Sequence, residues 1–455
     1  MLFGNITVEL KDLLNNMSSL RVLYLDDVNL VELPDSISHL KHLRFLCLCG
    51  TSISTIPRGI GNLKFLLVLD LCGCTNISQL PNCILELQKL RLLNFRGTSI
   101  TSVPRGFGKL KDLVILWGFT THSDNSTDVW CSIEELGPLS KLIRLDIRAL
   151  EKAPSGSMAA KAMLSSKHHL IDLDLIFTTR LGVNGEVRDD ISEEEHERIE
   201  DVLANLCPPT CMEELDIIGY FAHGLPQWMR TMSAFGSLRR LALDDYACCT
   251  QLPNGLGQLP FLDYFWVKRA PSVQCIRHDF LHPSLGGEAD GKEEAPALTG
   301  TQNKRRQPHH ISRGAGVAFP KLVALGFVGM LEWTEWEWEW EQHVPAMPAL
   351  EELMIQDCEL QRLPAGLAQH ACRLRELYLR NIQHLVSVEN FPSLVKLWSY
   401  ENPSLERISN NPSLQWIDIS NCQALKELDG LPSLRSLEWW DWVADALPEY
   451  LRRQT

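Results

Sequence analysis

The stretch LRVLYLDDVNLVELPDSISHLKHLRFLCL at residues 20–48 contains one leucine pattern twice. The pattern recurs at a nearly fixed spacing, as Leu20-Leu23-Leu25, Leu43-Leu46-Leu48, Leu66-Leu69-Leu71 and Leu90-Leu93-Phe95. Each unit also closes with an apolar residue and a proline, at Leu33-Pro34, Ile56-Pro57, Leu80-Pro81 and Val103-Pro104. Self-similarity at a nearly fixed period indicates a protein built from stacked repeats.

Twelve further units follow less regularly. The last four are shorter than the N-terminal units and evenly spaced, whereas the middle units are longer and unequal because insertions lie between Gly118 and Pro348. These twelve units start at Leu113, Leu142, Leu170, Met212, Leu238, Leu262, Leu322, Leu350, Leu374, Leu394, Leu414 and Leu434.

The segment x-L-x-L-x in each unit alternates apolar and variable residues, as a strand with one buried face does. One such strand cannot bury its leucines alone, so the units must stack into a long parallel sheet. The pattern predicts an α/β repeat fold, a leucine-rich-repeat solenoid (horseshoe) with a parallel sheet on the concave face and helices and irregular segments on the convex face. Three residues past the last strand leucine lie small residues that can bond neighbouring backbone, namely Thr51, Cys74, Thr98, Cys358 and Cys422.

We expect the whole chain to form one leucine-rich-repeat domain. Its parts are predicted as regular repeats at 18–118, repeats with insertions at 119–348, short regular repeats at 349–442 and a C-terminal cap at 443–455. Residues 286–316 are rich in Gly, Ala, Pro and mixed charge and contain almost no large apolar residue. This composition predicts a mobile loop.

Two insertions predict helices on the return side of the solenoid. Ser192 and Glu195 form a capping box that opens an acidic first helical turn. The apolar residues that follow share one helical face and end before Pro208-Pro209, and they are Ile199, Val202, Leu203 and Leu206. A second helix is expected from Ser157 to Lys167.

Charge and composition argue against several classes of function. The net charge of -14 argues against a nucleic-acid binder, which needs a basic face to meet phosphates. No run of eighteen or more apolar residues occurs, and the N-terminal residues do not follow a signal-peptide pattern, so we expect no membrane association. The basic stretch Lys304-Arg305-Arg306 is interpreted as a solvated tract, with a nuclear-import or anionic-partner site as the alternative.

No motif indicates catalysis or a cofactor. Gly286–Glu293 approaches the phosphate loop GxxxxGK[ST], but Glu293 replaces the hydroxyl that would hold magnesium and Pro296 interrupts any helix after it. The fourteen cysteines form no paired CxxC units at zinc-finger spacing, so we expect reduced thiols and no metal site. GxSxG and HExxH motifs are also missing. The sequence therefore predicts a binding protein and not an enzyme.

The variable positions of the C-terminal strands are the candidate binding residues. In x-L-x-L-x the leucines point inward and the x residues face the concave side. Near the C-terminus these positions are rich in aromatic and arginine side chains, which dominate binding hot spots. They are Tyr378, Arg380, Trp398, Tyr400, Trp416, Asp418, Glu438, Trp440 and Trp442.

Two interpretations of these residues stay open. Exposed aromatic side chains on adjacent strands are costly for solubility unless a partner covers them, which favours a protein-binding patch. Alternatively, Trp440 and Trp442 fold beneath a cap formed by residues 446–452, because solenoids need capped ends.

A second group of tryptophans, Trp333-x-x-Trp336-x-Trp338-x-Trp340, alternates with acidic residues as an amphipathic strand would. We interpret these side chains as packing on the edge of the solenoid, with ligand binding as the alternative.

Several stretches resemble the repeat domain of plant nucleotide-binding leucine-rich-repeat disease-resistance receptors, most of all the coiled-coil class common in grasses. Besides residues 20–71, they are AAKAMLSSKHHLIDLDL (159–175), IEDVLANLCPPTCMEELDIIGYFAHGLPQWM (199–229) and LEWTEWEWEWE (331–341). The resemblance covers nearly the whole chain. The N-terminal coiled coil and the nucleotide-binding switch domain of these receptors have no counterpart in it, so the chain resembles their C-terminal half.

The resemblance implies recognition of a pathogen effector, directly or through a guarded host protein, and regulation of a nucleotide-binding switch domain in cis or in trans. It also implies a cytoplasmic protein, with the nucleus as a second compartment. The N-terminal concave residues would then face the switch domain, and they are Tyr24, Asp26, Cys47, Cys49, Asp70, Cys72, Asn94 and Arg96. The alternative function is a generic cytosolic scaffold or a substrate-recruiting adaptor, and an extracellular receptor ectodomain ranks third.

Overall fold

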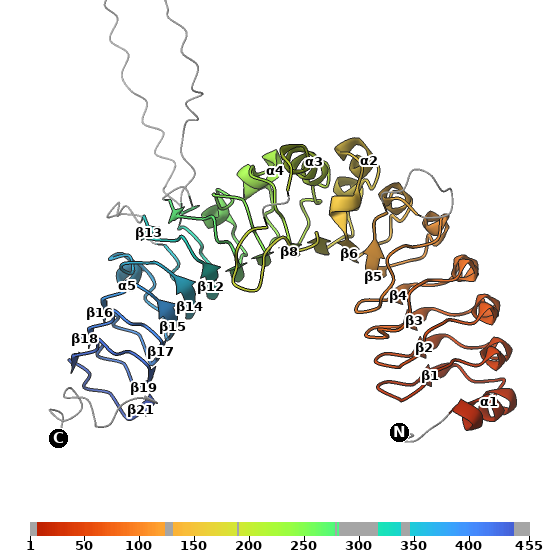
Figure 1. Cartoon of the computed structure of the whole chain (residues 1–455), viewed down its shortest axis with the longest axis horizontal. Coiled ribbons are helices and arrows are strands. Elements are labelled where there is room, and N and C mark those ends of the chain that lie inside the picture. Colours follow the sequence, from red (N-terminus) through yellow and green to blue (C-terminus); the bar gives the residue numbers. More distant parts are fainter. Residues whose placement is uncertain are drawn as a thin grey trace, which may run out of the picture.

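The structure, a computed structural model, describes residues 7–122, 131–188, 191–277, 280–281, 317–337 and 346–440. In these ranges the repeats stack into an arch whose inner, concave side is lined by strands and whose outer side carries helices and loops (Figure 1). None of the helices in these ranges is long and apolar enough to cross a membrane. The predicted mobile loop, with its near-phosphate loop and basic stretch, and the predicted cap lie outside the described residues.

Sixteen parallel strands form one sheet in chain order, which confirms the predicted solenoid. A strand begins two residues after each of the sixteen predicted repeat starts. The strands of this sheet are β1 (Val22–Tyr24), β2 (Phe45–Cys47), β3 (Val68–Asp70), β4 (Leu92–Asn94), β5 (Ile115–Thr120), β6 (Arg144–Arg148), β7 (Asp172–Ile176), β8 (Glu214–Ile218), β9 (Arg240–Asp244), β10 (Tyr264–Lys268), β12 (Ala324–Met330), β14 (Glu352–Cys358), β15 (Glu376–Ile382), β17 (Lys396–Tyr400), β19 (Trp416–Ser420) and β21 (Ser436–Trp440).

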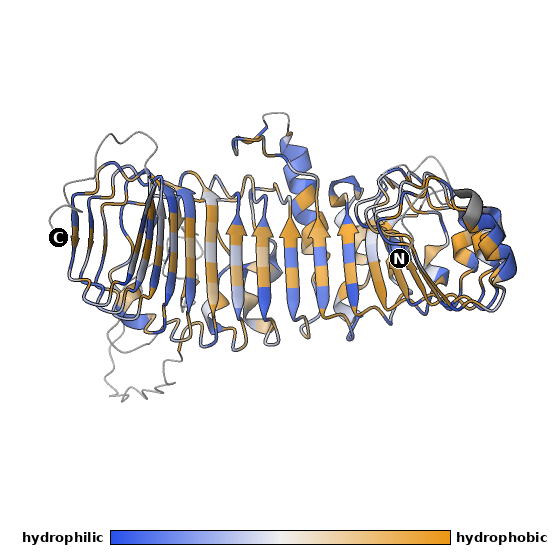
Figure 2. Ribbon diagram, turned by 90° about the horizontal axis from the view of Figure 1, so that it is seen from below, coloured by the Kyte–Doolittle hydropathy of each residue, from blue (hydrophilic) through white to orange (hydrophobic). Residues whose placement is uncertain are grey.

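The inward residues of the strands form a continuous core. Leu69 of β3 is fully buried and lies in register between Leu46 of β2 and Leu93 of β4. Seen from the concave side, hydrophobic residues alternate with hydrophilic ones along many of the strands (Figure 2). Burial of a leucine side chain contributes about 1.5–3 kcal/mol. Because each leucine needs a neighbouring repeat to cover it, the stability of one repeat depends on the next.

A residue with left-handed backbone follows the x-L-x-L-x segment in most repeats. Examples are Gly73 (φ 70°) and Asn381 (φ 51°), each two positions past the second apolar residue of that segment. Glycine and asparagine adopt this conformation at little cost. The turn directs the chain away from the concave sheet toward the return side.

The small polar position follows this turn and ties neighbouring repeats together. The hydroxyl of Thr51 and the thiol of Cys74 both donate to the carbonyl of Leu48, over 2.7 and 2.9 Å. The bonding role predicted for Thr51 and Cys74 is therefore confirmed. In a shorter repeat, the amide of Asn402 donates to the carbonyl of Leu379 at 3.1 Å in the same way.

Helices and 3-10 turns cover the outer side of the arch, and most are short. The helices are α1 (Thr7–Asn16), α2 (Gly156–Ala160), α3 (Glu193–Ala204), α4 (Gln227–Arg230) and α5 (Leu367–His370). The 3-10 turns are η1 (Asp35–His39), η2 (Arg58–Asn62), η3 (Asn82–Glu86), η4 (Phe107–Lys109), η5 (Ile133–Leu136), η6 (Leu150–Lys152), η7 (Leu164–Ser166), η8 (Met232–Ala234) and η9 (Leu256–Gln258). The predicted helix after Ser192 is confirmed as α3, and the Ser192 hydroxyl accepts from the backbone N–H of Glu195 at 3.3 Å.

The second predicted helix, from Ser157 to Lys167, is wrong in extent. α2 has only five residues, and Met163 has a left-handed backbone (φ 53°) that separates α2 from η7. This turn lets the buried Lys167 donate to the carbonyls of Leu136 and Leu139 in the preceding repeat, over 2.7 and 3.1 Å. Burial lowers the pKa of Lys167 to about 8. Its amine thus has a structural role at the end of η5.

The outer side of the C-terminal repeats contains strands, whereas the sequence predicts helices and irregular segments for the convex face. β16 (Ser387–Glu389), β18 (Arg407–Ser409) and β20 (Glu427–Asp429) form a second parallel sheet (Figure 1). The short C-terminal repeats leave little chain for a helical return, and the extended return buries Val388 and Ile408 instead. A shorter pair joins β11 (Cys275–Ile276) and β13 (Glu335–Trp336).

Candidate protein-binding surface

The strand register brings the predicted concave residues together at the C-terminal end of the sheet. Tyr378 lies beside Trp398, and Trp398 lies beside Asp418. In the next row, Arg380 lies beside Tyr400. We define the aromatic patch as the eight predicted residues that the structure describes, which are Tyr378, Arg380, Trp398, Tyr400, Trp416, Asp418, Glu438 and Trp440.

The rings of the aromatic patch contact one another edge to face. The ring centroids of Trp398 and Trp416 lie 4.9 Å apart at an angle of 61°, and those of Tyr378 and Tyr400 lie 5.7 Å apart at 81°. A third contact, of 6.4 Å between Tyr378 and Trp398, links the two pairs. Such contacts add about 0.5–1.5 kcal/mol per pair beyond simple burial. The rings therefore form one connected surface.

Polar groups hold these rings in place. The Tyr400 hydroxyl donates to the carboxylate of Asp418, and burial together with this bond raises the pKa of Tyr400, so the phenol remains a donor. The indole Nε1 of Trp416 donates to Oε1 of Glu438 at 3.2 Å. Side chains that are already fixed lose little conformational entropy when a partner binds.

Much of the aromatic patch remains accessible. Tyr378, Trp398 and Trp416 are half-buried, and Trp440 is 55% exposed. Fixed rings that stay partly accessible offer apolar area to a partner. Trp442 and the predicted cap lie outside the described residues.

Trp266, which was not among the residues predicted from the sequence, extends this surface along the concave face. Its ring lies over Gly326, where a Cβ atom would come within 2.1 Å of the ring. An open cavity of about 200 Å³ forms beside it, and its lining residues are Trp266, Leu325, Glu352, Leu353, Met354, Glu376, Tyr378 and Trp398. Its place on the concave face could have been predicted from the sequence, because Trp266 occupies the middle variable position of x-L-x-L-x in its repeat.

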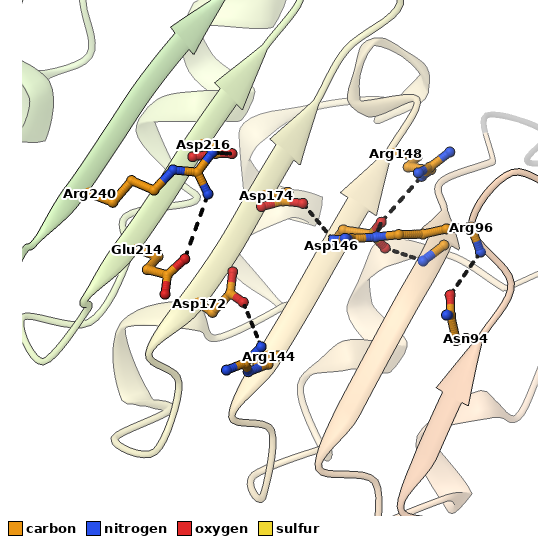
Figure 3. Close-up of polar contacts among 11 residues, drawn as sticks. Asn94, Arg96, Arg144, Asp146, Arg148, Asp172, Asp174, Glu214, Asp216 and Arg240 are labelled. Atoms are coloured by element: carbon orange, nitrogen blue, oxygen red, sulfur yellow. Dashed lines mark hydrogen bonds and ion pairs between the residues drawn. The ribbon is translucent and has the colours of Figure 1, made fainter. Parts of the chain in front are cut away.

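The middle of the concave face carries ion pairs in place of aromatic rings. Asp146, Asp174 and Asp216 lie in register on β6, β7 and β8. We define the central charged cluster as these three and their charged neighbours, Arg96, Arg144, Arg148, Asp172, Glu214 and Arg240 (Figure 3). Of its members, only Arg96 was among the residues predicted from the sequence.

Asp146 is the buried centre of this cluster. Its carboxylate is fully buried and pairs with Nε of Arg96 at 2.6 Å and Nε of Arg148 at 3.3 Å. It also accepts the backbone N–H of Gly118, which a bulge in β5 directs toward it. Arg96 reaches across to Asp174 at 2.5 Å. These bonds compensate for the removal of the carboxylate from water.

Asp174 gives the central charged cluster a pH response. Burial raises the pKa of Asp174 to about 7, because it disfavours the charged form more than Arg96 favours it, and Asp216, Asp172 and Asp146 add repulsion. A carboxyl whose pKa is raised by folding stabilises the protein below its unfolded pKa, and this contribution is lost as the pH rises toward 7. We therefore expect a carboxyl-carbon NMR titration of Asp174 to show a midpoint near 7.

The variant that tests this pH dependence is Asp174→Asn, whose side chain does not ionise. Between pH 4 and 7 its free energy of unfolding is expected to fall less steeply than that of the wild type. A midpoint near the ordinary value of 3.8 would contradict the assignment.

The N-terminal end of the concave face carries smaller and more polar side chains than the aromatic patch. Tyr24 is 59% exposed and stacks on Phe45, with ring centroids 6.2 Å apart. The sulfur atoms of Cys47 and Cys49 lie 3.3 Å apart as free thiols. Arg96, the last predicted residue of this end, belongs to the central charged cluster.

The tryptophan run of residues 333–340 contributes to the core where the structure describes it. Trp333 is fully buried and Trp336 is 7% exposed. Both rings contact Phe327, at centroid distances of 5.1 and 5.5 Å. Both rings pack, as interpreted, but they do so within the core and not on the edge of the solenoid. Trp338 and Trp340 lie outside the described ranges.

Comparisons with known proteins agree with this fold. Residues 2–292 match the model of a family described as a leucine-rich repeat region. A protein of Arabidopsis thaliana named "Putative disease resistance RPP13-like protein 1" is 27% identical over 318 residues, which cover 68% of this chain and 27% of that protein. The chain thus spans about a quarter of the length of that relative. The structure of the leucine-rich-repeat protein LIC12759 of Leptospira interrogans aligns with a TM-score of 0.56 and 19% identity, over 98% of this chain and 95% of that one.

Proposed function

The chain belongs to the leucine-rich-repeat family, and from this premise we propose that it is the protein-binding recognition domain of an intracellular plant immune receptor. In this proposal it senses a pathogen effector, directly or through a guarded host protein, and regulates a nucleotide-binding switch domain. The observation that carries the proposal is the aromatic patch, in which interlocked, half-buried rings lie on neighbouring strands of a concave sheet.

Three features support binding as the function. Aromatic and arginine side chains at the centre of an interface supply most of its binding energy. The cavity beside Trp266 provides a recess in which a partner side chain can be buried. Proteins of this fold typically act as interaction modules, so we propose no catalytic role. The Arabidopsis relative is named for disease resistance, which directs the proposal to immunity.

The switch domain would bind at the N-terminal end of the arch, opposite to the aromatic patch. Apart from Arg96, the N-terminal concave residues lie on the far side of the central charged cluster from the aromatic patch, so the two proposed binding surfaces do not overlap. The switch domain would be supplied in cis or in trans. The proposal places the protein in the cytoplasm, with the nucleus as a second compartment.

A cytosolic scaffold or substrate-recruiting adaptor is the alternative function, because it would use the same surface. The coding sequence upstream of Met1 separates the two. A phosphate loop in frame there supports the receptor, and an unrelated upstream sequence favours the adaptor.

The binding proposal is tested with peptides selected from a random display library against the full chain. We expect them to bind at the aromatic patch, because such screens favour apolar hot spots. The double variant Trp398→Ala/Trp416→Ala should weaken their affinity about 100-fold or more. Tyr400 is left intact because its hydroxyl satisfies Asp418.

The matched control is Tyr24→Ala, which removes an exposed aromatic ring from the other end of the same face. It should leave peptide affinity unchanged. A double variant that loses thermal stability but keeps its affinity would show that these two rings serve packing, and would overturn the proposal.

A further inference from the structure

Three segments of the middle repeats bring two histidines and a cysteine together. His196 lies on α3, His223 lies in the loop after β8, and Cys248 lies in the loop after β9. One nitrogen of each imidazole and the sulfur of Cys248 all lie within 4.8 Å of one another. Side chains from well-separated parts of the sequence thus converge on one point.

The histidine at the centre of this group is oriented for coordination. His196 is 8% exposed, and its Nδ1 lies 2.7 Å from the carbonyl oxygen of Phe221. A carbonyl only accepts, so Nδ1 carries the proton, and in the neutral ring Nε2 carries the free lone pair. A backbone carbonyl that fixes the tautomer in this way is the usual outer-shell partner of a metal-binding histidine.

The other two side chains approach from the solvent side and from the core. The ring of His223 stacks on that of His196 with centroids 4.0 Å apart, and its side chain is 58% exposed. Its Nε2 lies 3.9 Å from Oε2 of Glu193. Cys248 is 8% exposed, and no hydrogen bond of its thiol occurs among the residues that the structure describes.

We propose that His196, His223 and Cys248 bind one divalent ion of the zinc type. Nitrogen and sulfur donors favour zinc over magnesium or calcium, and three protein ligands leave a fourth position for water. The distances between ligand atoms in a tetrahedral zinc site are roughly 3.3–3.8 Å. His223 must rotate out of its stack on His196 so that the in-plane lone pairs of both rings point at one ion, and its exposed side chain permits this rotation. The ion links α3 to the two repeats that follow it.

This site differs from the expectation of no metal drawn from the cysteine spacing. That expectation rested on the lack of CxxC pairs, whereas here the ligands come from three repeats and only one is a cysteine. Sequence spacing alone does not bring His196 near Cys248. The two residues come together only because the repeats stack on one another.

The test uses the full chain, stripped with a chelator and titrated with Co²⁺ as a spectroscopic substitute for Zn²⁺. We expect one equivalent to bind with visible bands of a tetrahedral site and a near-ultraviolet thiolate charge-transfer band. Zn²⁺ should displace the Co²⁺, raise the melting temperature and slow amide hydrogen exchange in α3.

Two variants decide the assignment. His223→Ala alters an exposed side chain and should fold normally. It should lower Zn²⁺ affinity about 100-fold or more, because loss of a direct ligand costs at least as much as the roughly 10–100-fold loss typical of an outer-shell partner. Cys248→Ser should abolish the thiolate band. The controls His169→Ala and Cys372→Ser change exposed residues outside the site and should bind one equivalent as the wild type does. Unchanged affinity in His223→Ala, or no tetrahedral spectrum in the wild type, would overturn the proposal.

Discussion

Replacing Trp333 with alanine is expected to lower the free energy of unfolding by about 3–5 kcal/mol. Trp333 is fully buried, and its ring contacts Phe327 at 5.1 Å and Trp336 at 5.7 Å. Its indole Nε1 donates to the carbonyl of Glu335 at 2.8 Å. Alanine would remove these contacts and leave a cavity that the surrounding strands fill only in part.

Denaturant titration measures this loss, and hydrogen exchange locates it. Exchange should accelerate first in β12 and its neighbours, because each repeat is stabilised by those beside it. Trp440→Ala is the control, since Trp440 is 55% exposed, and its effect should stay within about 0.5 kcal/mol. A loss of less than about 1 kcal/mol in Trp333→Ala would mean that the tryptophan run is not part of the core.

Replacing Asp146 with alanine is expected to cost a similar amount, about 3–5 kcal/mol. The variant removes the carboxylate that pairs with Arg96 and Arg148 and that accepts the N–H of Gly118. The loss is large because the buried N–H of Gly118 loses its acceptor and the half-buried Arg96 and Arg148 lose the carboxylate that pairs with both of them. Asp174 retains its own pair with Arg96, so part of the central charged cluster survives.

The matched control is Asp112→Ala. Asp112 pairs with Lys141 at 2.7 Å, but the two side chains are 45% and 60% exposed. Pairs of this kind contribute about 0–1 kcal/mol. Equal effects of the two substitutions, measured at the same pH and salt concentration, would contradict the burial argument for Asp146.

The strands and their buried faces were predictable because two periods determine them. The repeat period places each strand, and alternation within x-L-x-L-x decides which side chains point inward. The aromatic patch follows from the same rule, since Tyr378, Trp398 and Asp418 occupy equivalent positions in successive repeats of equal length.

The central charged cluster was not predicted, although its residues occupy those same positions. Arg96 meets Asp146 and Asp174 across 50 and 78 residues, after insertions that make the repeats unequal in length. The contact also depends on a bulge in β5. Bulges and insertions have no periodic signal, so they appear only once the strands are stacked.

The outer face was the least predictable part of the fold. Return segments differ in length and composition from repeat to repeat, so helices, 3-10 turns and strands all occur there. The end of α2 at Ala160 and the sheet formed by β16, β18 and β20 depend on the space left between neighbouring repeats. The proposed metal site belongs to this face and was missed for the same reason.

The central claim is that the aromatic patch is the surface by which this protein recognises another protein. Side-chain footprinting of the full chain, with and without a bound selected peptide, tests it most directly. We predict that binding protects the rings of Tyr378, Trp398 and Trp416 and leaves Tyr24 as reactive as before. Protection confined to the helices of the outer face, with these three rings unchanged, would contradict the account.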